Sequence, residues 1–387
     1  MLENLITLRL NQCRKLHKHP SSMGNLKSLH HLYMKETAVK ELPESFGMLT
    51  SLQVLTIGEK RSTQVQPNSP LVALPSSFTN LSSLQELDAW AWRICGEIPD
   101  DFEKLSNLEV LFLGSNDFHK LPSCLSGLSL LKDLQLPNCE KLESLPPLPS
   151  SLENLNLANC ISLEHLSDLS NLEGLRDLNL TNCVKLVDIP GLEYLKSLKT
   201  LYMSNCSKCA SAAKKSLSKV YLKNLKNLSM PGSIIPYSLS QDTITFSSHK
   251  SLDLTGVILM VVVSINHHVP DELRYRIPAV VDVQAQIFDG DRAIHTTVLN
   301  LIGVPKTNQD HVHLCRYPAH CPLVSLLNDG FKIKVTAQNP PYVKGVELKK
   351  AGVFLVYKND DDYDGNEESL NESQQTVSEI SQVFQLS

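Results

Sequence analysis

The densest group of potential metal ligands lies between His311 and Cys321, where three histidines and two cysteines occur within eleven residues. Zinc sites use four such side chains, and on an extended strand His311, His313 and Cys315 would share one face. The spacing matches no common zinc motif, so a polar strand face is the preferred interpretation. We therefore predict no metal and no cofactor for this chain.

A second candidate for chemistry is the C-x-x-C pair Cys206 and Cys209. Redox activity of such a pair needs a thioredoxin-like βαβ setting, which the flanking sequence does not suggest. The chain also contains no Gly-x-x-x-x-Gly-Lys-Ser/Thr phosphate loop and no Gly-x-Ser-x-Gly nucleophile elbow. We predict that it is not an enzyme. Zinc chemistry at His311–Cys321 is the alternative, which a metal assay would test.

The bulk composition narrows the class of partner. A chain of 387 residues is too long for one ordinary core, so we expect two domains. The net charge of -5 comes without a basic stripe, so nucleic acid is not an expected partner. The longest apolar run, Val257–Val263, has the length of a strand, so a membrane is not expected either. Ten cysteines without a basic and apolar leader favour free thiols in a reducing compartment.

The elements that must position any functional residue are set by an internal repeat. The pattern Leu-x-x-Leu-x-Leu, or a close variant, occurs nine times, and its first leucines are Leu5, Leu29, Leu52, Leu84, Leu108, Leu131, Leu152, Leu175 and Leu198. Seven of the steps are 21 to 24 residues and one is 32. One such repeat cannot bury its own leucines, so neighbours must stack. The sequence predicts an α/β leucine-rich repeat solenoid, or horseshoe.

A polar or small residue follows each Leu-x-Leu by three positions in most repeats. We expect it to turn inward and bond to backbone groups of adjacent repeats. The positions are Cys13, Thr37, Asn116, Cys139, Cys160, Cys183 and Cys206. The other side of each repeat carries Leu-Pro or Ile-Pro pairs, which favour loops and short helical turns. The stretch Gly58–Leu71 is predicted to project as a loop and accounts for the long step.

Side chains between and just after the strand leucines should line the concave face. Exposed aromatic rings beside charges are typical of protein-binding hot spots. The candidate binding residues are Arg9, Tyr33, Lys35, Asp88, Trp90, Phe112, Gln135, Asn156, Asn179 and Tyr202. Around Trp90 and Trp92 the repeat departs from its consensus, so burial of both rings is the alternative there.

After the repeats the pattern changes to short strand-like runs. Seven runs separated by turn residues predict an all-β sandwich of the jelly-roll or Ig-like kind. The runs are 243–246, 256–265, 280–288, 295–301, 311–314, 331–337 and 352–357. The expected organisation is repeats over 1–206, a cap or connector over 207–227, the sandwich over 228–358 and an acidic disordered tail over 359–387.

Several motifs resemble plant intracellular immune receptors of the TIR-NB-LRR class. Repeats with Asn-Cys-x-x-Leu, as in Leu155–Leu163, resemble theirs, and so does Leu145-Pro-Pro-Leu-Pro-Ser-Ser-Leu152. Met230-Pro-Gly-Ser-Ile-Ile-Pro236 is similar to the opening of their post-LRR domain, and Val346–Tyr357 is similar to its closing strand. The opening motif departs from the usual pattern at Ile234 and at 237–239. The resemblance extends over residues 1 to about 358.

The resemblance implies a recognition function rather than catalysis. In that class the concave surface and the post-LRR domain bind a pathogen effector, which releases self-inhibition and permits homo-oligomerisation. The expected partners are therefore a pathogen effector or host regulator, and in a full receptor its own nucleotide-binding domain. The expected location is the cytoplasm or the nucleus. Because the chain begins within the repeats, we expect a fragment or truncated product. A scaffold that regulates or competes with a full-length receptor is the alternative function.

Overall fold

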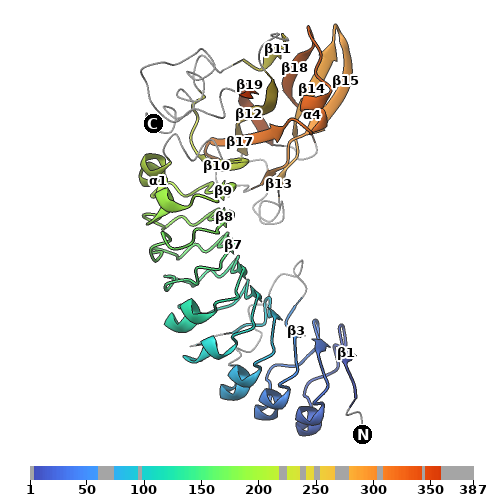
Figure 1. Cartoon of the computed structure of the whole chain (residues 1–387), viewed down its shortest axis with the longest axis vertical. Coiled ribbons are helices and arrows are strands. Elements are labelled where there is room, and N and C mark those ends of the chain that lie inside the picture. The colour runs from blue at the N-terminus through green and yellow to red at the C-terminus, as the bar shows by residue number, and fades with distance from the viewer. Residues whose placement is uncertain are drawn as a thin grey trace. The chain divides into compact units, whose positions relative to one another are not determined.

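The structure is a computed structural model and forms two compact units (Figure 1). It describes residues 4–59, 74–94, 98–217, 225–235, 241–247, 253–265, 279–302, 308–341 and 345–358. The first unit comprises residues 1–178 and 183–197, and the second comprises 179–182 and 198–387. Most of the predicted 58–71 loop and the whole predicted acidic tail lie outside the described residues.

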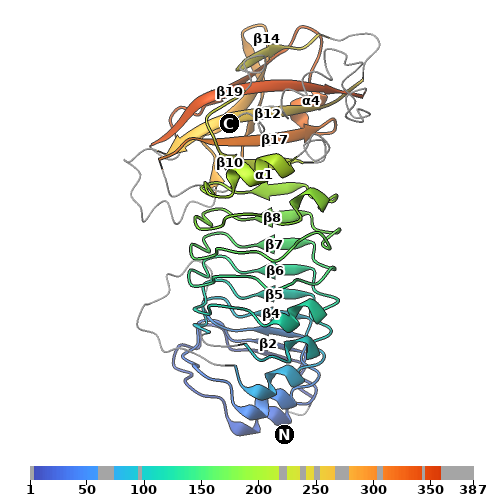
Figure 2. The ribbon, with the colours of Figure 1, turned by 90° about the vertical axis from the view of Figure 1, so that its left-hand side faces the viewer.

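The first unit is the predicted solenoid. Its three-residue strands are β1 (Thr7–Arg9), β2 (His31–Tyr33), β3 (Val54–Thr56), β4 (Glu86–Asp88), β5 (Val110–Phe112), β6 (Asp133–Gln135) and β7 (Asn154–Asn156). From β1 to β7 they pair in parallel and in register. Strand β8 (Asp177–Asn179) follows, and its last residue belongs to the second unit. Figure 2 shows these strands stacked as successive rungs.

The opposite side of the repeats carries 3-10 helices rather than α-helices. They are η1 (Ser21–Asn25), η2 (Glu44–Met48), η3 (Ser76–Asn80), η4 (Phe102–Lys104), η5 (Ser123–Gly127) and η6 (Leu192–Tyr194). Prolines precede η1, η2, η3 and η5 in extended backbone conformation, which explains the recurring Leu-Pro pairs. Between strands and helices lies a core of leucines and of Phe46, Phe78, Phe102 and Phe118, all with no exposed surface.

The second unit contains β9 (Thr200–Tyr202), α1 (Ala210–Ser216) and the strands that follow. Within it, β9, β10 (Asn227–Pro231), β17 (His311–Pro318), β12 (Leu254–Ile265) and β19 (Val346–Tyr357) are hydrogen-bonded in that order. A second sheet has the order β11 (Thr243–Thr245), β18 (Lys332–Ala337), β14 (Val283–Asp289) and β15 (Arg292–Val298). A small pair joins β13 (Ala279–Val280) to β16 (Leu301–Ile302), and α4 (Pro322–Ser325) is one short turn.

Apolar residues of both larger sheets form one core in the second unit. It joins Val257, Leu259 and Val261 of β12 to Ala285 and Ile287 of β14. The predicted run 280–288 is divided between β13 and β14, because Val281 and Asp282 lie outside both strands. Within the described ranges, no helix is both long and apolar enough to cross a membrane.

Candidate protein-binding surface on the concave sheet

The outward positions of each strand are decided by its central leucine. In β2 to β7 that leucine is buried, so the residue on either side of it points to the face opposite the 3-10 helices, here called the concave face. Each strand thus supplies two outward side chains. A third comes from the loop residue that follows the central leucine by three positions. The face is a grid with three columns and one row for each repeat.

The predicted binding residues occupy this grid in the first unit, except for two. Arg9 is exposed, Asp88 is buried, and the others are half-buried, namely Tyr33, Lys35, Trp90, Phe112, Gln135 and Asn156. Asn179 and Tyr202 fall in the second unit and are half-buried there. Their role in binding stays a prediction.

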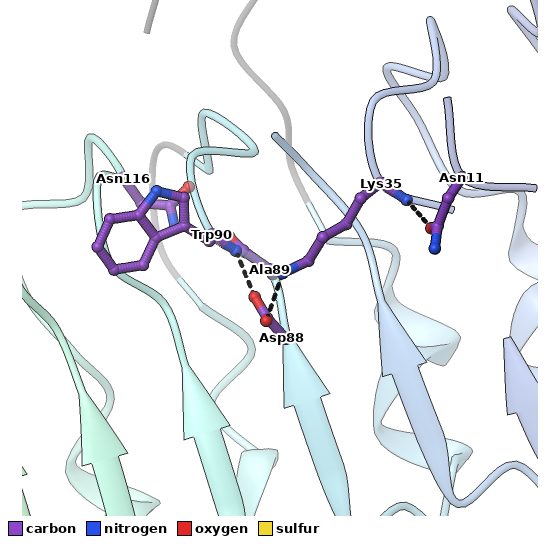
Figure 3. A network of polar contacts seen from close by, with 6 residues as sticks. All are labelled: Asn11, Lys35, Asp88, Ala89, Trp90 and Asn116. Carbon is purple, nitrogen blue, oxygen red and sulfur yellow. Dashed lines mark hydrogen bonds and ion pairs between the residues drawn. The ribbon is translucent and has the colours of Figure 1, made fainter. Parts of the chain in front are cut away.

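A polar network spans four of the repeats (Figure 3). Lys35 Nζ reaches across β3 to Asp88 Oδ2 at 2.5 Å, and Asp88 Oδ1 accepts a hydrogen bond from the Trp90 backbone N–H at 3.2 Å. At the other end of the lysine, its backbone N–H donates to Asn11 Oδ1 at 2.9 Å. Asp88 is only 5% exposed, so the lysine supplies the positive charge that a buried carboxylate needs.

Two glycines make room for this network in the third column. Gly58 lies between Lys35 and Trp90 with a φ of 87°, and an added Cβ there would lie 2.1 Å from the Trp90 carbonyl oxygen. At Gly114, a Cβ would lie 2.3 Å from Cζ3 of the Trp90 indole. The indole therefore lies against the bare backbone of the next repeat, and Trp90 is held by the shape of its neighbours.

The two tryptophans have different environments. Trp90 is half-buried on the concave face, as predicted, whereas Trp92 is 5% exposed and its Nε1–H donates to the Val39 carbonyl at 3.4 Å. Ala91 and Arg93, on either side of Trp92, both have left-handed backbone (φ 53° and 62°). This irregular turn directs the second ring into the core, so the alternative of burial holds for Trp92.

At the N-terminal end of the grid, aromatic and basic groups are stacked. The guanidinium of Arg9 lies 4.6 Å from the centre of the Tyr33 ring, and the His31 ring stacks on Tyr33 at 6.5 Å. Further along, Gln135 donates to Asp133 at 2.6 Å and Asn156 donates to Gln135 at 2.8 Å. The face thus presents an aromatic and basic region at one end and carboxylates and amides further along.

The first column was missed by the sequence analysis. Its residues precede the central leucine and point outward with the predicted ones, since side chains alternate along a strand. They are Thr7, His31, Val54, Glu86, Val110, Asp133, Asn154 and Asp177. The available signal was the x-Leu-x alternation itself, which marks both neighbours of the leucine.

The cysteines of the repeat mostly behave as predicted. Cys139, Cys160 and Cys183 are fully buried, and each thiol donates to a carbonyl one repeat earlier at 3.2 to 3.3 Å. Burial raises the pKa of the Cys139 thiol to about 12, so it stays protonated. Cys206 does the same in the second unit, towards Leu180. None of the nine described cysteines is in a disulfide.

Two of the residues that were predicted to turn inward differ from that prediction. Cys13 is exposed, because it lies in the first described repeat and no earlier described repeat covers it. Thr37 is half-buried, and its hydroxyl donates to the Met34 carbonyl of its own repeat at 3.1 Å. Asn116 does span repeats, donating to Ala89 and accepting from Ile94.

Two histidines of the 311–321 segment, His311 and His313, are buried, whereas His320 is exposed. His311 donates from Nδ1 to Gln309 O at 2.8 Å and accepts the Asn205 N–H at Nε2 at 2.9 Å. Burial lowers the pKa of His311 to about 4 and that of His313 to about 3. In the part of the chain that the structure describes, no three His, Cys, Asp or Glu side chains are grouped for a metal ion.

Comparison with known proteins relates the repeats to plant immunity. Residues 1–85 match the family model described as "Disease resistance protein RPS4B-like, leucine-rich repeats". TMV resistance protein N of Nicotiana glutinosa is 31% identical over 153 residues, 39% of this chain and 13% of that protein. Disease resistance protein RPS4B of Arabidopsis thaliana is 28% identical over 162 residues, 39% of this chain and 14% of that protein. The resemblance to disease resistance proteins is thus confirmed for the repeat region.

Two of the solved structures that match this chain are described as leucine-rich repeat proteins. One is the leucine-rich repeat domain of the type III effector XopL, at 27% identity and a TM-score of 0.36, covering 49% of this chain and 70% of that one. Another is a Leptospira interrogans LRR protein, at 21% identity and a TM-score of 0.37, covering 60% and 69%. The matched segment of this chain spans only about an eighth of the two plant relatives, so their whole activities are not assigned to it.

Proposed function

We propose that this chain is the ligand-recognition part of a plant TIR-type intracellular immune receptor. In this proposal the concave face of the repeats binds a protein from a pathogen, and the second unit contributes a further binding surface. The chain acts by binding, and signalling belongs to domains of a full receptor. The second unit would then be the jelly-roll or Ig-like post-LRR domain of the class, and the setting the cytoplasm or nucleus.

The observation that carries the proposal is the concave grid on repeats related to disease resistance proteins. Tyr33, Trp90 and Phe112 place aromatic rings, each partly covered, on one face of a rigid sheet. Such rings give large contact area at a small cost in side-chain entropy, which is why they dominate protein interfaces. The same face would also contact the nucleotide-binding domain in the resting receptor, so a ligand and self-inhibition would compete for it.

The test is a response assay in leaf cells with a full receptor that carries these repeats. Tyr33→Ala and Phe112→Ala should each abolish the response to a recognised effector. Tyr194→Ala, on the helix side and 56% exposed, should leave it intact. Direct titration of the purified chain with the effector should show the same order of affinities. If both concave variants retain full response and affinity, the binding surface is elsewhere.

A further inference from the structure

The carboxylates of the concave face follow a regular spacing. In the first column Glu86 lies on β4, Asp133 on β6 and Asp177 on β8, so one occurs on every second strand. The register places Val110 between Glu86 and Asp133, and Asn154 follows Asp133 on the next strand. Neighbouring strands are about 4.8 Å apart, so successive carboxylates are about 10 Å apart along the row. Figure 2 shows the strands that carry this row.

No basic side chain occupies the outward positions of the same strands. From β3 to β8, the two outward residues of each described strand include neither lysine nor arginine. The basic residues nearest to the row are engaged elsewhere: Lys132 pairs with Glu109 at 2.9 Å and Arg176 with Glu153 at 3.2 Å. Lys35 is held by Asp88. This part of the face is therefore acidic by its composition.

Glu86, on β4, is the first carboxylate of the row. Its side chain is half-buried and forms no ion pair or side-chain hydrogen bond with the residues that the structure describes. Val54 and Val110 lie directly opposite it on the neighbouring strands, and Phe112 lies on the same face two residues beyond Val110. Aliphatic walls suit the methylene stem of a lysine or arginine, the carboxylate suits its charged end, and an aromatic face adds cation–π attraction.

From this charge complementarity we propose that the concave face takes a basic segment of the partner protein, laid across the strands. Lysine or arginine side chains spaced by about 10 Å would meet Glu86, Asp133 and Asp177 in turn. In a segment of polyproline II conformation, with three residues per turn, this spacing corresponds to every third residue, and in a helix to every seventh. The proposal rests on the proposed function for the claim that a protein binds here, and adds the chemistry of that protein.

The probe is a labelled twelve-residue peptide with lysine at every third position and leucine or serine between. Matched peptides carry glutamine or glutamate in place of the lysines, or the same lysines at every second position. Fluorescence anisotropy with the full chain, at low and at 300 mM salt, measures each affinity. The peptide with lysine at every third position should bind more tightly than the others, and its affinity should fall as salt screens the charges.

The matched variants are Glu86→Gln and Glu193→Gln, which each remove one negative charge. Only the first removes a charge from the row, because Glu193 lies on η6, on the helix side of the repeats. Glu86→Gln should weaken the binding of the lysine peptide about 3- to 10-fold, as expected for one partly exposed ion pair, and Glu193→Gln should leave it unchanged. Equal binding of lysine and glutamate peptides, or full affinity in Glu86→Gln with an unaltered melting temperature, would overturn the proposal. Equal binding of both lysine spacings would overturn the register.

The two proposals fail separately. If an effector response needs Tyr33 and Phe112 but survives Glu86→Gln, the proposal of a basic partner segment is wrong and the proposed recognition function stands. If the lysine peptide binds through Glu86 while effector recognition ignores every concave variant, the surface chemistry is right and the proposed function is wrong.

Discussion

At the scale of single residues, the concave face contains projecting positions and interlocked positions. Tyr33 and Phe112 project outward beside buried central leucines, and Tyr33 contacts the outward side chains of Arg9 and His31. Trp90 instead lies against Gly114, and Asp88 depends on Lys35 from a repeat two steps away. A change at an interlocked position must therefore disturb its neighbours, which makes the packing of Trp90 directly testable.

Gly114→Ala should push the Trp90 indole out of its place, because the added Cβ would lie 2.3 Å from the ring. The chain has two tryptophans, so Trp92→Phe isolates the emission of Trp90. In that background Gly114→Ala should shift the emission to longer wavelength. The matched control is Gly174→Ala, where the nearest atom is 3.8 Å away. Identical spectra for both alanine variants would show that the indole does not lie on Gly114.

At the scale of elements, the repeat is a strand, a buried cysteine or asparagine and a 3-10 turn, stacked in register. The leucine periodicity predicted which residues face outward, because alternation along a strand leaves no other choice for Tyr33 and Phe112. It could not predict the burial of Asp88, which depends on the reach of Lys35 past Gly58. Nor could it predict the burial of Trp92, because the left-handed backbone of its two neighbours has no sequence signature.

The buried cysteines of the repeats should stabilise the stack wherever a further repeat packs on each side of them. Cys160→Ala removes a thiol that donates to Leu136 O at 3.2 Å and leaves a small cavity. We expect a loss of about 1 to 2 kcal/mol in the free energy of unfolding. Cys13→Ala, at an exposed position, should change stability by less than about 0.5 kcal/mol. Urea denaturation followed by circular dichroism measures both, and equal losses would contradict a role for inward packing.

At the scale of the whole molecule, two buried histidines make the second unit sensitive to acid. His311 and His313 are buried and neutral in the second unit, and in the unfolded chain they would titrate near 6.5. Between pH 6.5 and about 4 the unfolded state therefore binds protons that the folded state does not. The stability of this unit is then full above pH 6.5 and falls as the pH drops.

Lowering the pH from 8 to 5 should cost the second unit about 2 kcal/mol from His311 alone. Calorimetry should show a transition that falls in temperature over this range. Tryptophan emission reports only the first unit, since Trp90 and Trp92 both lie there, and identifies which transition moves. In His311→Gln the fall should be smaller than in the wild type. An equal fall would mean that His311 does not supply the acid sensitivity.

The grid of outward positions also affects how such a surface changes over generations. If the proposed function is right, a substitution at a projecting position, such as Tyr33 or Phe112, alters what is recognised and leaves the leucine core intact, so single mutations suffice to explore new ligands. Five positions form a set in which a change at one disturbs the contacts of the others, namely Lys35, Gly58, Asp88, Trp90 and Gly114. Diversification should therefore proceed stepwise around this set, and the set itself should be inherited or replaced as a block.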